Sequence, residues 1–562
     1  MNITMDVRDL LQLTGMQAPL RQDYDYIIIG SGSAGSVLAA RLSEDETARI
    51  LVLEAGPMDR SLYMLRMPAA LAEPMKSETY NWAYYSEPEP YLDGRRVYYP
   101  RGRVVGGSSS INGMVYLRGN PQDYDGWAQT NGLERWSFAH CLPYFKRMES
   151  SALGPSEFRG EGGPLRVSIP ECDNPLFQAY IQAGIQAGFG YTDDVNGFRQ
   201  EGVCKFERST FEGVRSSAAR RYLHPARQKG RIDLRVKVRV SRINLEGTAA
   251  RSVTFIERGE EHTVRAGREV LLCAGAFNSP QLLMLSGIGP ADELRSHGIA
   301  VKADLPGVGQ NLQDHLDYLL QYHCTKPISL YPATRPLGRL AVGLRWLLFK
   351  SGVGASNIWE AGSFFRSNDD VPYPNLQHHF APVAISYDGN ERVEGHGFQI
   401  HISQMRPRSR GWVKLRSSDP FAPPRIQFNH LMDETDRAEI REGIRMTRHL
   451  VSQKAFDPYR GEEIAPGSNR QSDAELDAFA RAKGETSHHP SCTCRMGLDE
   501  MAVVDGEGRV HGLEGLRVVD ASIMPNVVTA NLNATVIMLA EKIADHIMGK
   551  PPLAAQPVAY HR

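Results

Sequence analysis

The chain has 562 residues, which corresponds to two to four compact units at roughly 100–200 residues per domain. Its 64 Lys and Arg residues against 65 Asp and Glu residues give a formal net charge of −1, which argues against a nucleic-acid binder that relies on a basic field. Hydrophobic residues at 41% and charged residues at 23% are ordinary globular usage. The longest apolar runs, 341–349 and 527–540, are too short and too interrupted by polar residues to predict a transmembrane segment.

The start of the chain and the cysteines bear on its compartment. Residues 1–25 carry Asp6, Asp9 and Asp23, and no apolar stretch follows a basic head, so they do not resemble a signal peptide. Seven cysteines spread along a long chain do not predict a disulfide framework, and the lone C-x-C at 492–494 lacks metal-site spacing, so we expect no metal. We therefore expect a cytoplasmic protein; peripheral membrane attachment and a homo-oligomer stay open.

The clearest local pattern begins at residues 24–29, a short apolar run that predicts a buried parallel strand. A G-x-G-x-x-G motif and a predicted helix over 36–42 follow; the three glycines are Gly30, Gly32 and Gly35. The glycines allow a tight turn and close approach to a pyrophosphate, whose charge the helix N-terminus attracts. A second apolar run, 50–53, ends at Glu54, whose carboxylate can accept hydrogen bonds from ribose hydroxyls. This arrangement predicts dinucleotide binding without distinguishing NAD from FAD.

Two longer segments point to one cofactor. Residues 102–125 read GRVVGGSSSINGMVYLRGNPQDYD and residues 275–289 read GAFNSPQLLMLSGIG. Together with the N-terminal motif they closely resemble the two signature segments of the glucose-methanol-choline (GMC) oxidoreductases, which are FAD enzymes. The resemblance continues in HHPSCTCRMG from His488, VVDASIMP from Val518 and ANLNATVIMLAEKIAD from Ala530. Within the family the chain is most similar to the choline dehydrogenases, on segments such as NLQDHLDYLLQY, ASNIWEAGSFFR and PNLQHHFAPVAI.

The resemblance implies an α/β fold in which an FAD-binding, Rossmann-like domain is interleaved with a substrate domain built on an antiparallel sheet. The FAD-binding domain is expected at 1–170, 210–314 and 485–562, and the substrate-binding domain at 171–209 and 315–484. The residue pattern adds a helix over 435–453, where apolar residues recur at helical spacing.

The resemblance also implies a set of flavin contacts. The loop 106–110 offers backbone N–H groups and hydroxyls to a flavin or its phosphates, although a plain surface turn is the alternative. Val238 is placed against the adenine, where a core valine is the alternative. The expected cofactor-binding residues are Gly30, Gly32, Gly35, Glu54, Gly106, Gly107, Ser108, Asn112, Gly113, Val238, Asp520, Ala521 and Asn533. Choline oxidases of the family attach FAD through a histidine before the asparagine of an SSxN segment; Ile111 stands there, so we expect non-covalent FAD.

Oxidation of an alcohol by a flavin requires a hydride to leave the carbon while a side chain takes the hydroxyl proton. The resemblance assigns the catalytic base to His489, and an ordinary histidine pKa near ~6.5 suits that task. Because consecutive side chains of an extended segment alternate, we expect His488 to face away from the flavin. Asn531, where many family members carry a second histidine, can donate a hydrogen bond to the substrate oxygen. A helix N-cap is the alternative for Asn531, but Asn533 is the better capping candidate.

The expected reaction is oxidation of a primary alcohol to an aldehyde by hydride transfer to flavin N5, with choline to betaine aldehyde as the first expectation. Asp317 matches a family glutamate that faces the trimethylammonium group, and His379 matches another pocket residue. Trp359 is a candidate for an aromatic cage, with core packing as the alternative. An aliphatic, aromatic or polyol alcohol, and a non-catalytic or lyase-like flavoprotein, are the alternatives; His489 and Asn531 argue against the last. The electron acceptor, whether quinone, carrier or oxygen, is left open.

Overall fold

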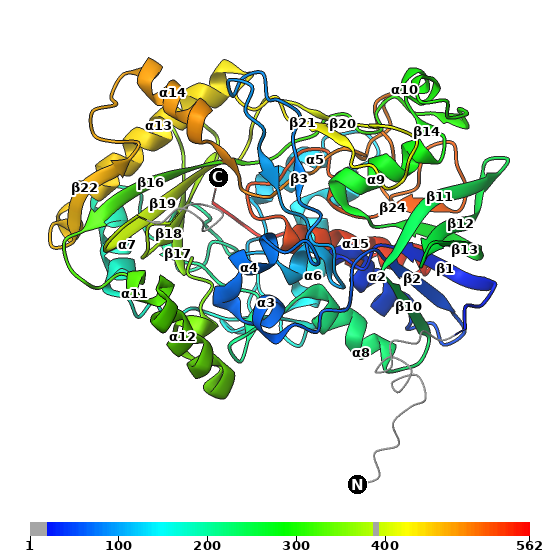
Figure 1. Cartoon of the computed structure of the whole chain (residues 1–562), viewed down its shortest axis with the longest axis horizontal. Coiled ribbons are helices and arrows are strands. Elements are labelled where there is room, and N and C mark those ends of the chain that lie inside the picture. Colours follow the sequence, from blue (N-terminus) through cyan, green and yellow to red (C-terminus); the bar gives the residue numbers. More distant parts are fainter. Residues whose placement is uncertain (1–18, 386–392, 562) are drawn as a thin grey trace, which may run out of the picture.

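The computed structural model describes residues 19–385 and 393–561. Residues 1–18, on which most of the signal-peptide prediction depends, lie outside this part. Two seven-stranded sheets form the two ends of the molecule, and α15 (Asn533–Ile547) lies between them (Figure 1). The mixed α/β architecture agrees with the predicted fold class.

The first sheet contains the nucleotide-binding pattern. Its order is β10-β2-β1-β13-β12-β11, with β24 beside β13. The strands are β1 (Asp23–Ile29), β2 (Ile50–Glu54), β10 (Ile232–Val236), β11 (Val238–Glu246), β12 (Ala249–Glu257), β13 (Glu260–Leu272) and β24 (Leu516–Val518). The second half of β13 pairs in parallel with β1 and β24, while its first half forms an antiparallel meander with β12 and β11. The strands predicted at 24–29 and 50–53 and the helix predicted over 36–42, now α2 (Ser33–Leu42), are confirmed.

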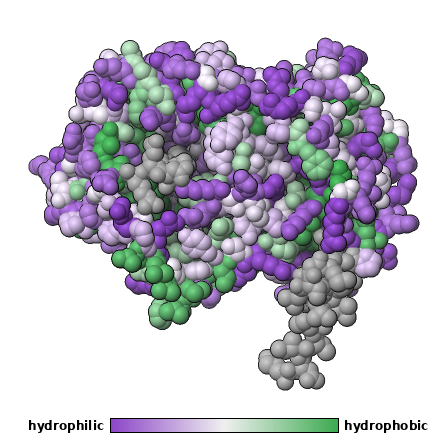
Figure 2. Space-filling view, viewed as in Figure 1, coloured by the Kyte–Doolittle hydropathy of each residue, from purple (hydrophilic) through white to green (hydrophobic). Residues whose placement is uncertain are grey.

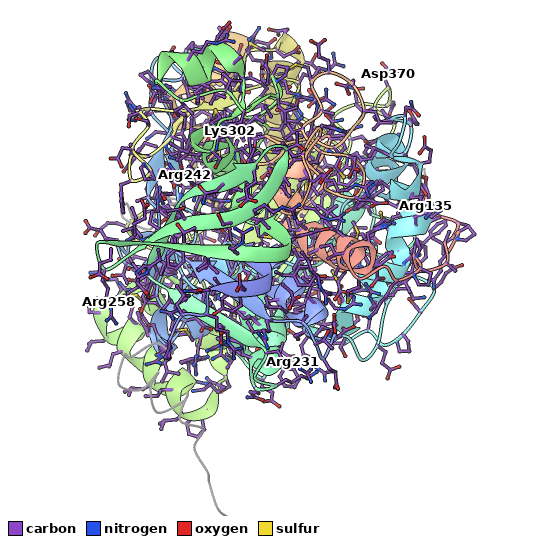
Figure 3. All side chains as sticks on the ribbon, turned by 90° about the vertical axis from the view of Figure 1, so that its right-hand side faces the viewer. Arg135, Arg231, Arg242, Arg258, Lys302 and Asp370 are labelled. Carbon is purple, nitrogen blue, oxygen red and sulfur yellow. The ribbon has the colours of Figure 1, made fainter. Side chains whose placement is uncertain are left out.

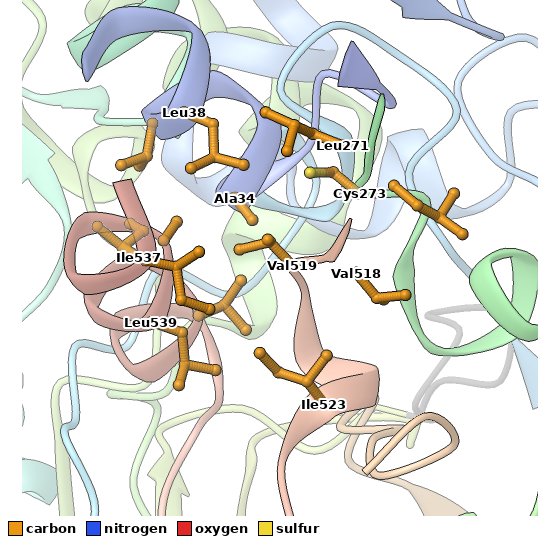
Figure 4. Close-up of a cluster of buried hydrophobic side chains, with 14 of the residues drawn as sticks. Ala34, Leu38, Leu271, Cys273, Val518, Val519, Ile523, Ile537 and Leu539 are labelled. Atoms are coloured by element: carbon orange, nitrogen blue, oxygen red, sulfur yellow. The ribbon is translucent and has the colours of Figure 1, made fainter. Parts of the chain in front are cut away.

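Helices α2 and α15 pack together against this sheet (Figure 4). Leu38 of α2, Ile537 and Leu539 of α15 and Leu271 of β13 are fully buried in one cluster. Burial of each such aliphatic side chain stabilises the fold by about 1.5–3 kcal/mol. This shared core fixes the starts of both helices, and those starts border the site.

The second sheet is antiparallel throughout, in the order β22-β16-β19-β18-β17-β7 with β23 beside β16. Its strands are β7 (Gly202–Lys205), β16 (Leu316–Cys324), β17 (Ala361–Phe365), β18 (Leu376–Ala381), β19 (Gly397–Gln404), β22 (Arg460–Ala465) and β23 (Glu485–Thr486). Helices α7 (Pro175–Gln186) and α13 (Glu434–Val451) pack on it, and α13 confirms the helix predicted near 435–453.

Side-chain alternation gives β18 and β19 one apolar and one polar set of residues. Phe380, Ile400 and Ile402 belong to the buried apolar cluster that includes residues of α7 and α13. The intervening positions carry Gln377, His379, Gln399, His401 and Ser403. His379 and His401 lie directly opposite each other in the register and border the cavity described below.

Shorter elements connect the two sheets. The other helices are α3 (Leu62–Arg66), α4 (Ala72–Met75), α5 (Pro121–Trp127), α6 (Phe138–Met148), α8 (His224–Arg227), α9 (Gly275–Leu285), α10 (Ala291–Ser296), α11 (Tyr331–Thr334), α12 (Pro336–Phe349) and α14 (Asp473–Lys483). The short turns are η1 (Pro68–Ala70), η2 (Gly107–Ser110), η3 (Glu134–Trp136), η4 (Ala219–Leu223), η5 (Gly352–Ala355), η6 (Lys454–Phe456) and η7 (Ala521–Ile523). Small two-stranded pairs are β3 (Tyr84–Tyr85) with β4 (Tyr98–Tyr99), β5 (Glu149–Ser151) with β6 (Leu165–Val167), β8 (Thr210–Phe211) with β9 (Val214–Arg215), β14 (Ile288–Gly289) with β15 (Ala303–Asp304), and β20 (Trp412–Lys414) with β21 (Arg425–Gln427).

The distribution of basic side chains on the surface and the length of the helices bear on two kinds of partner, nucleic acids and membranes. Figure 3 shows Arg135, Arg231, Arg242 and Arg258 on separate parts of one face. Among residues 19–385 and 393–561, no helix combines the length and apolar composition needed to cross a bilayer.

Candidate active site

Two glycine-rich turns meet at the carboxyl ends of β1 and β2. Gly30 has a φ of 96°, a backbone conformation that side chains other than glycine rarely adopt. A Cβ added to Gly107 would lie 2.7 Å from the Cα of Gly32, so the two turns touch through bare backbone. Gly32 is the N-cap of α2, and no side chain caps that helix start. The free N–H groups at the start of α2, and the positive end of its helix dipole, suit an anionic group such as a pyrophosphate.

Glu54 closes the end of β2 with a fully buried carboxylate. One oxygen accepts hydrogen bonds from the backbone N–H and the hydroxyl of Ser31, at 3.0 and 2.7 Å, and the other accepts from the N–H of Gly56 at 2.8 Å. Burial raises the pKa of this carboxyl above its ordinary value. Glu54 therefore holds the glycine turn in place while it also borders the cavity.

A cavity of ≈ 320 Å³ extends from these turns to the polar residues of the second sheet. Most of the residues expected from the sequence line it: Gly30, Gly32, Glu54, Gly107, Ser108, Asn112, Gly113, Val238, Trp359, His379, His489, Asp520, Ala521, Asn531 and Asn533. Three do not line it: Gly35, Gly106 and Asp317. Gly35 has a packing reason, since a Cβ there would lie 1.9 Å from the carbonyl oxygen of Gly30.

The C-terminal segment joins the glycine turns through side-chain hydrogen bonds. Asp520 accepts from the N–H of Gly275 at 2.8 Å and from the hydroxyl of Ser279 at 2.6 Å. Asn533 accepts from the hydroxyl of Ser33 at 2.7 Å, which ties the start of α15 to the start of α2. The capping role expected for Asn533 is wrong, because Leu532 occupies the N-cap position of α15 and the Asn533 side chain bonds α2 instead.

A chain of hydrogen bonds fixes the protonation of His489. His315 Nε2 lies 3.0 Å from the carbonyl oxygen of Met405, so this nitrogen carries the hydrogen and donates it. His315 Nδ1 is then the acceptor for His489 Nδ1–H at 2.9 Å. His489 Nε2 therefore bears a lone pair, and it accepts a hydrogen bond from Asn531 Nδ2 at 3.1 Å. The lone pair sits at the cavity wall, where it can accept a proton.

Burial keeps both rings neutral. Desolvation lowers the pKa of His315 to about 3 and lowers that of His489 well below its ordinary value, with neighbouring histidines adding to the effect on His489. Desolvation also lowers the pKa of His379 to about 4. A neutral His489 is the form that can act as a base. Sequence reasoning missed His315, although it lies inside the NLQDHLDYLLQY segment that carries part of the family resemblance.

His488 departs from its expected placement. Its φ is 67°, so the chain is not extended there and the alternation of side chains fails. Both His488 and His489 line the cavity. The guanidinium of the half-buried Arg101 donates to the His488 carbonyl oxygen at 2.8 Å. The expectation that only one of the two histidines faces this space is wrong.

Asp317 lies behind the cavity wall instead of in it. Its carboxylate accepts from His401 Nδ1 and from the Ser403 hydroxyl, both at 2.8 Å. His401 lines the cavity, and its Nε2 lies 2.9 Å from Gln399 Nε2 and 3.4 Å from Trp359 Nε1. A cation in the cavity would therefore meet His401 before Asp317. No motif marked His401, because strand pairing alone brings it opposite His379.

Family models described as GMC oxidoreductase match residues 24–317 and 407–540. The chain belongs to the GMC oxidoreductase family. It is 52% identical over 543 residues to an oxygen-dependent choline dehydrogenase of Paraburkholderia phymatum, covering 96% of this chain and 95% of that protein. It is 53% identical over 543 residues to an oxygen-dependent choline dehydrogenase of Yersinia pseudotuberculosis, covering 96% of each chain.

Solved structures agree with this GMC assignment. Pyridoxine 4-oxidase from Mesorbium loti superposes with a TM-score of 0.84 at 32% identity, covering 94% of this chain and 100% of that chain. A formate oxidase superposes with a TM-score of 0.89 at 26% identity, covering 95% of this chain and 99% of that chain. The chain therefore has the fold of the GMC oxidoreductases.

Proposed function

We propose that this protein is an FAD-dependent alcohol dehydrogenase that oxidises choline to betaine aldehyde. The observation that carries the proposal is the Nε2 lone pair of His489, held beside the Asn531 amide at the cavity wall. The names of the two relatives at 52% and 53% identity support choline as the substrate.

The residues that line the cavity fit FAD. The free N–H groups of α2 and the bare contact between Gly32 and Gly107 suit the pyrophosphate, and Glu54 is placed for a ribose. Val238 would contact the adenine, while Ser108, Asn112 and Gly113 would lie along the flavin. When bound, FAD supplies a hydride acceptor. Ile111 offers no nucleophile for a covalent bond, so the flavin is held without one.

The protein's own residues handle the proton and the oxygen of the alcohol. His489 Nε2 accepts the hydroxyl proton, and the His315 contact keeps the other ring nitrogen protonated, so the ring cannot turn its N–H toward the substrate. The Asn531 amide, which bonds His489 in the structure, donates to the alcohol oxygen and stabilises the negative charge that develops there. Gln377 Nε2 lies 3.4 Å from the Asn531 carbonyl oxygen and orients that amide.

The trimethylammonium end would lie toward His401, His379 and Trp359. Trp359 offers an aromatic face, and the charge of Asp317 acts on the cation through the His401 ring. A neutral alcohol is the second candidate substrate, and one observation favours it: the Asp317 carboxylate is already engaged by His401 and Ser403.

We further propose that the FAD-binding part takes 1–170, 210–314 and 485–562 and the substrate-binding part takes 171–209 and 315–484. In support, every strand of the first sheet falls in the first set, and all strands of the second sheet except β23 fall in the second. The cytoplasmic location and a homo-oligomeric state stay predictions.

The test is anaerobic mixing of the yellow holoprotein with choline, 3,3-dimethylbutanol, an aromatic alcohol and a polyol, followed by turnover with an artificial acceptor. We expect flavin bleaching and turnover with choline. Bleaching only by the uncharged alcohols would replace choline with the second candidate, and no bleaching by any alcohol would overturn the proposed function.

A further inference from the structure

Helix α12 presents an apolar face to solvent. Six large side chains on it are between 51% and 83% exposed: Leu337, Leu340, Leu344, Leu347, Leu348 and Phe349. Figure 2 shows a hydrophobic patch at the lower left, where α12 projects from the body in Figure 1. Contiguous apolar patches beyond a few hundred Å² are rare on monomeric proteins and mark interaction sites.

The helix is anchored so that this face must point outward. Trp346 is its one buried side chain, and the indole Nε1 donates to the Gly213 carbonyl oxygen at 2.7 Å. The indole packs with Met67 and Ala70, beside Val342 of the same helix. Because the inward side is fixed by these contacts, the leucines cannot be buried by rotating the helix.

The charged residues of the segment that contains α12 are all basic. Residues 326–359 contain five basic residues and no acidic residue; the basic ones are Lys326, Arg335, Arg339, Arg345 and Lys350. Arg335, Arg339 and Arg345 are exposed, although Arg339 also pairs with Glu73. An apolar helix face bordered by cations is the pattern of helices that lie in the interface of anionic membranes.

We propose that α12 docks this protein on an anionic phospholipid bilayer, with its leucines and Phe349 at the acyl boundary and its arginines at the headgroups. A second copy of the chain is the less favourable occupant, because a two-fold contact would bring the cations of both copies together. The docked helix would also lie close to the cavity. Its inner side packs on η1, and the chain continues from η1 to Leu71 and Met75, which line the cavity.

Flotation of the holoprotein with lipid vesicles tests the proposal. We expect binding to vesicles of phosphatidylcholine mixed with phosphatidylglycerol, little binding to phosphatidylcholine alone, and weakening by salt. The double variant Leu344→Glu/Leu348→Glu should lower the vesicle-bound fraction by about tenfold. The matched control, Leu153→Glu/Leu498→Glu, changes leucines that are 46% and 54% exposed on other elements and should bind like the wild type.

The flavin spectrum reports that both variants are folded. Failure of the wild type to float with the anionic vesicles would overturn the proposal, as would equal binding by the two double variants. Light scattering tests the other occupant, a second copy of the chain. If the wild type does not bind vesicles but is a dimer, and only the α12 variant is a monomer, the face is an interface between two copies.

Discussion

Removal of the His315 ring tests how the structure sets the proton on His489. In His315→Leu, the His489 Nδ1–H loses its acceptor in a buried setting. A buried donor without a partner costs about 1–3 kcal/mol. The neutral ring avoids that cost by moving its hydrogen to Nε2, the atom that must be bare to take the alcohol proton. Since ~1.4 kcal/mol is tenfold in rate, flavin reduction should slow by about 5- to 150-fold.

The assay is anaerobic stopped-flow bleaching of the bound flavin at saturating alcohol, followed against pH. Loss of the neighbouring ring also removes one of the influences that depress the His489 pKa, so the acid limb of the rate profile should move to higher pH. His378→Leu is the matched control. His378 is another fully buried histidine, with a pKa lowered to about 3 and a 2.8 Å contact to Thr447 Oγ1, and it does not line the cavity.

Equal slowing in His378→Leu would mean that the loss reflects a damaged core. A His315→Leu rate within twofold of the wild type, with an unchanged pH profile, would refute the proposed tautomer.

Five further predictions concern the base, the cofactor and the charged end of the substrate. The His489→Ala variant should keep its flavin, but the alcohol should reduce that flavin ~10²–10⁴-fold more slowly, the range for a general base. A stopped-flow bleaching rate less than tenfold below that of the wild type would contradict the assignment of His489 as the base. In the wild type the depressed pKa keeps His489 neutral below the ordinary histidine value, so the acid limb of kcat/KM should lie below pH ~6.5. Acid precipitation should leave the yellow colour in the supernatant, because Ile111 cannot bond the flavin; a yellow pellet would contradict this. Asp317→Asn should lower kcat/KM for choline about tenfold more than for 3,3-dimethylbutanol, and Asp317→Glu should preserve choline turnover; equal losses on both alcohols would favour a neutral substrate. Gly107→Ala should lower the flavin content measured by absorbance, because the new Cβ would meet the Gly32 backbone at 2.7 Å, whereas Gly126→Ala, with nothing within 4 Å, should retain it.

The parts of the fold that local sequence determines could be predicted from it. The strand, glycine turn, helix and second strand between Asp23 and Glu54 follow from apolar periodicity and from glycines placed where backbone must approach backbone. The sequence predicts His489 and Asn531 because their motifs are continuous in the chain, and both residues line the cavity.

The parts that were missed depend on contacts between distant segments. His401 faces the cavity because the register of β18 and β19 sets it opposite His379, and no local pattern reports a register. His315 matters only because His489, far along the chain, lies 2.9 Å away. His488 was misplaced because its positive φ cannot be read from a run of residues that otherwise looks extended.

The late position of β24 in the chain has a consequence for biosynthesis. β13 pairs with β1 on one side, but the other side of its last residues stays open until β24, at Leu516–Val518, has been made. A growing chain therefore carries an unpaired strand edge from the synthesis of Leu272 until that of Leu516, and such edges recruit strands from other chains. The same late segment supplies His489, Asn531 and α15. Release from the ribosome is thus the moment at which the edge is covered and the cofactor cavity is completed together, so a chain that stops short of β24 would be both inactive and prone to aggregate.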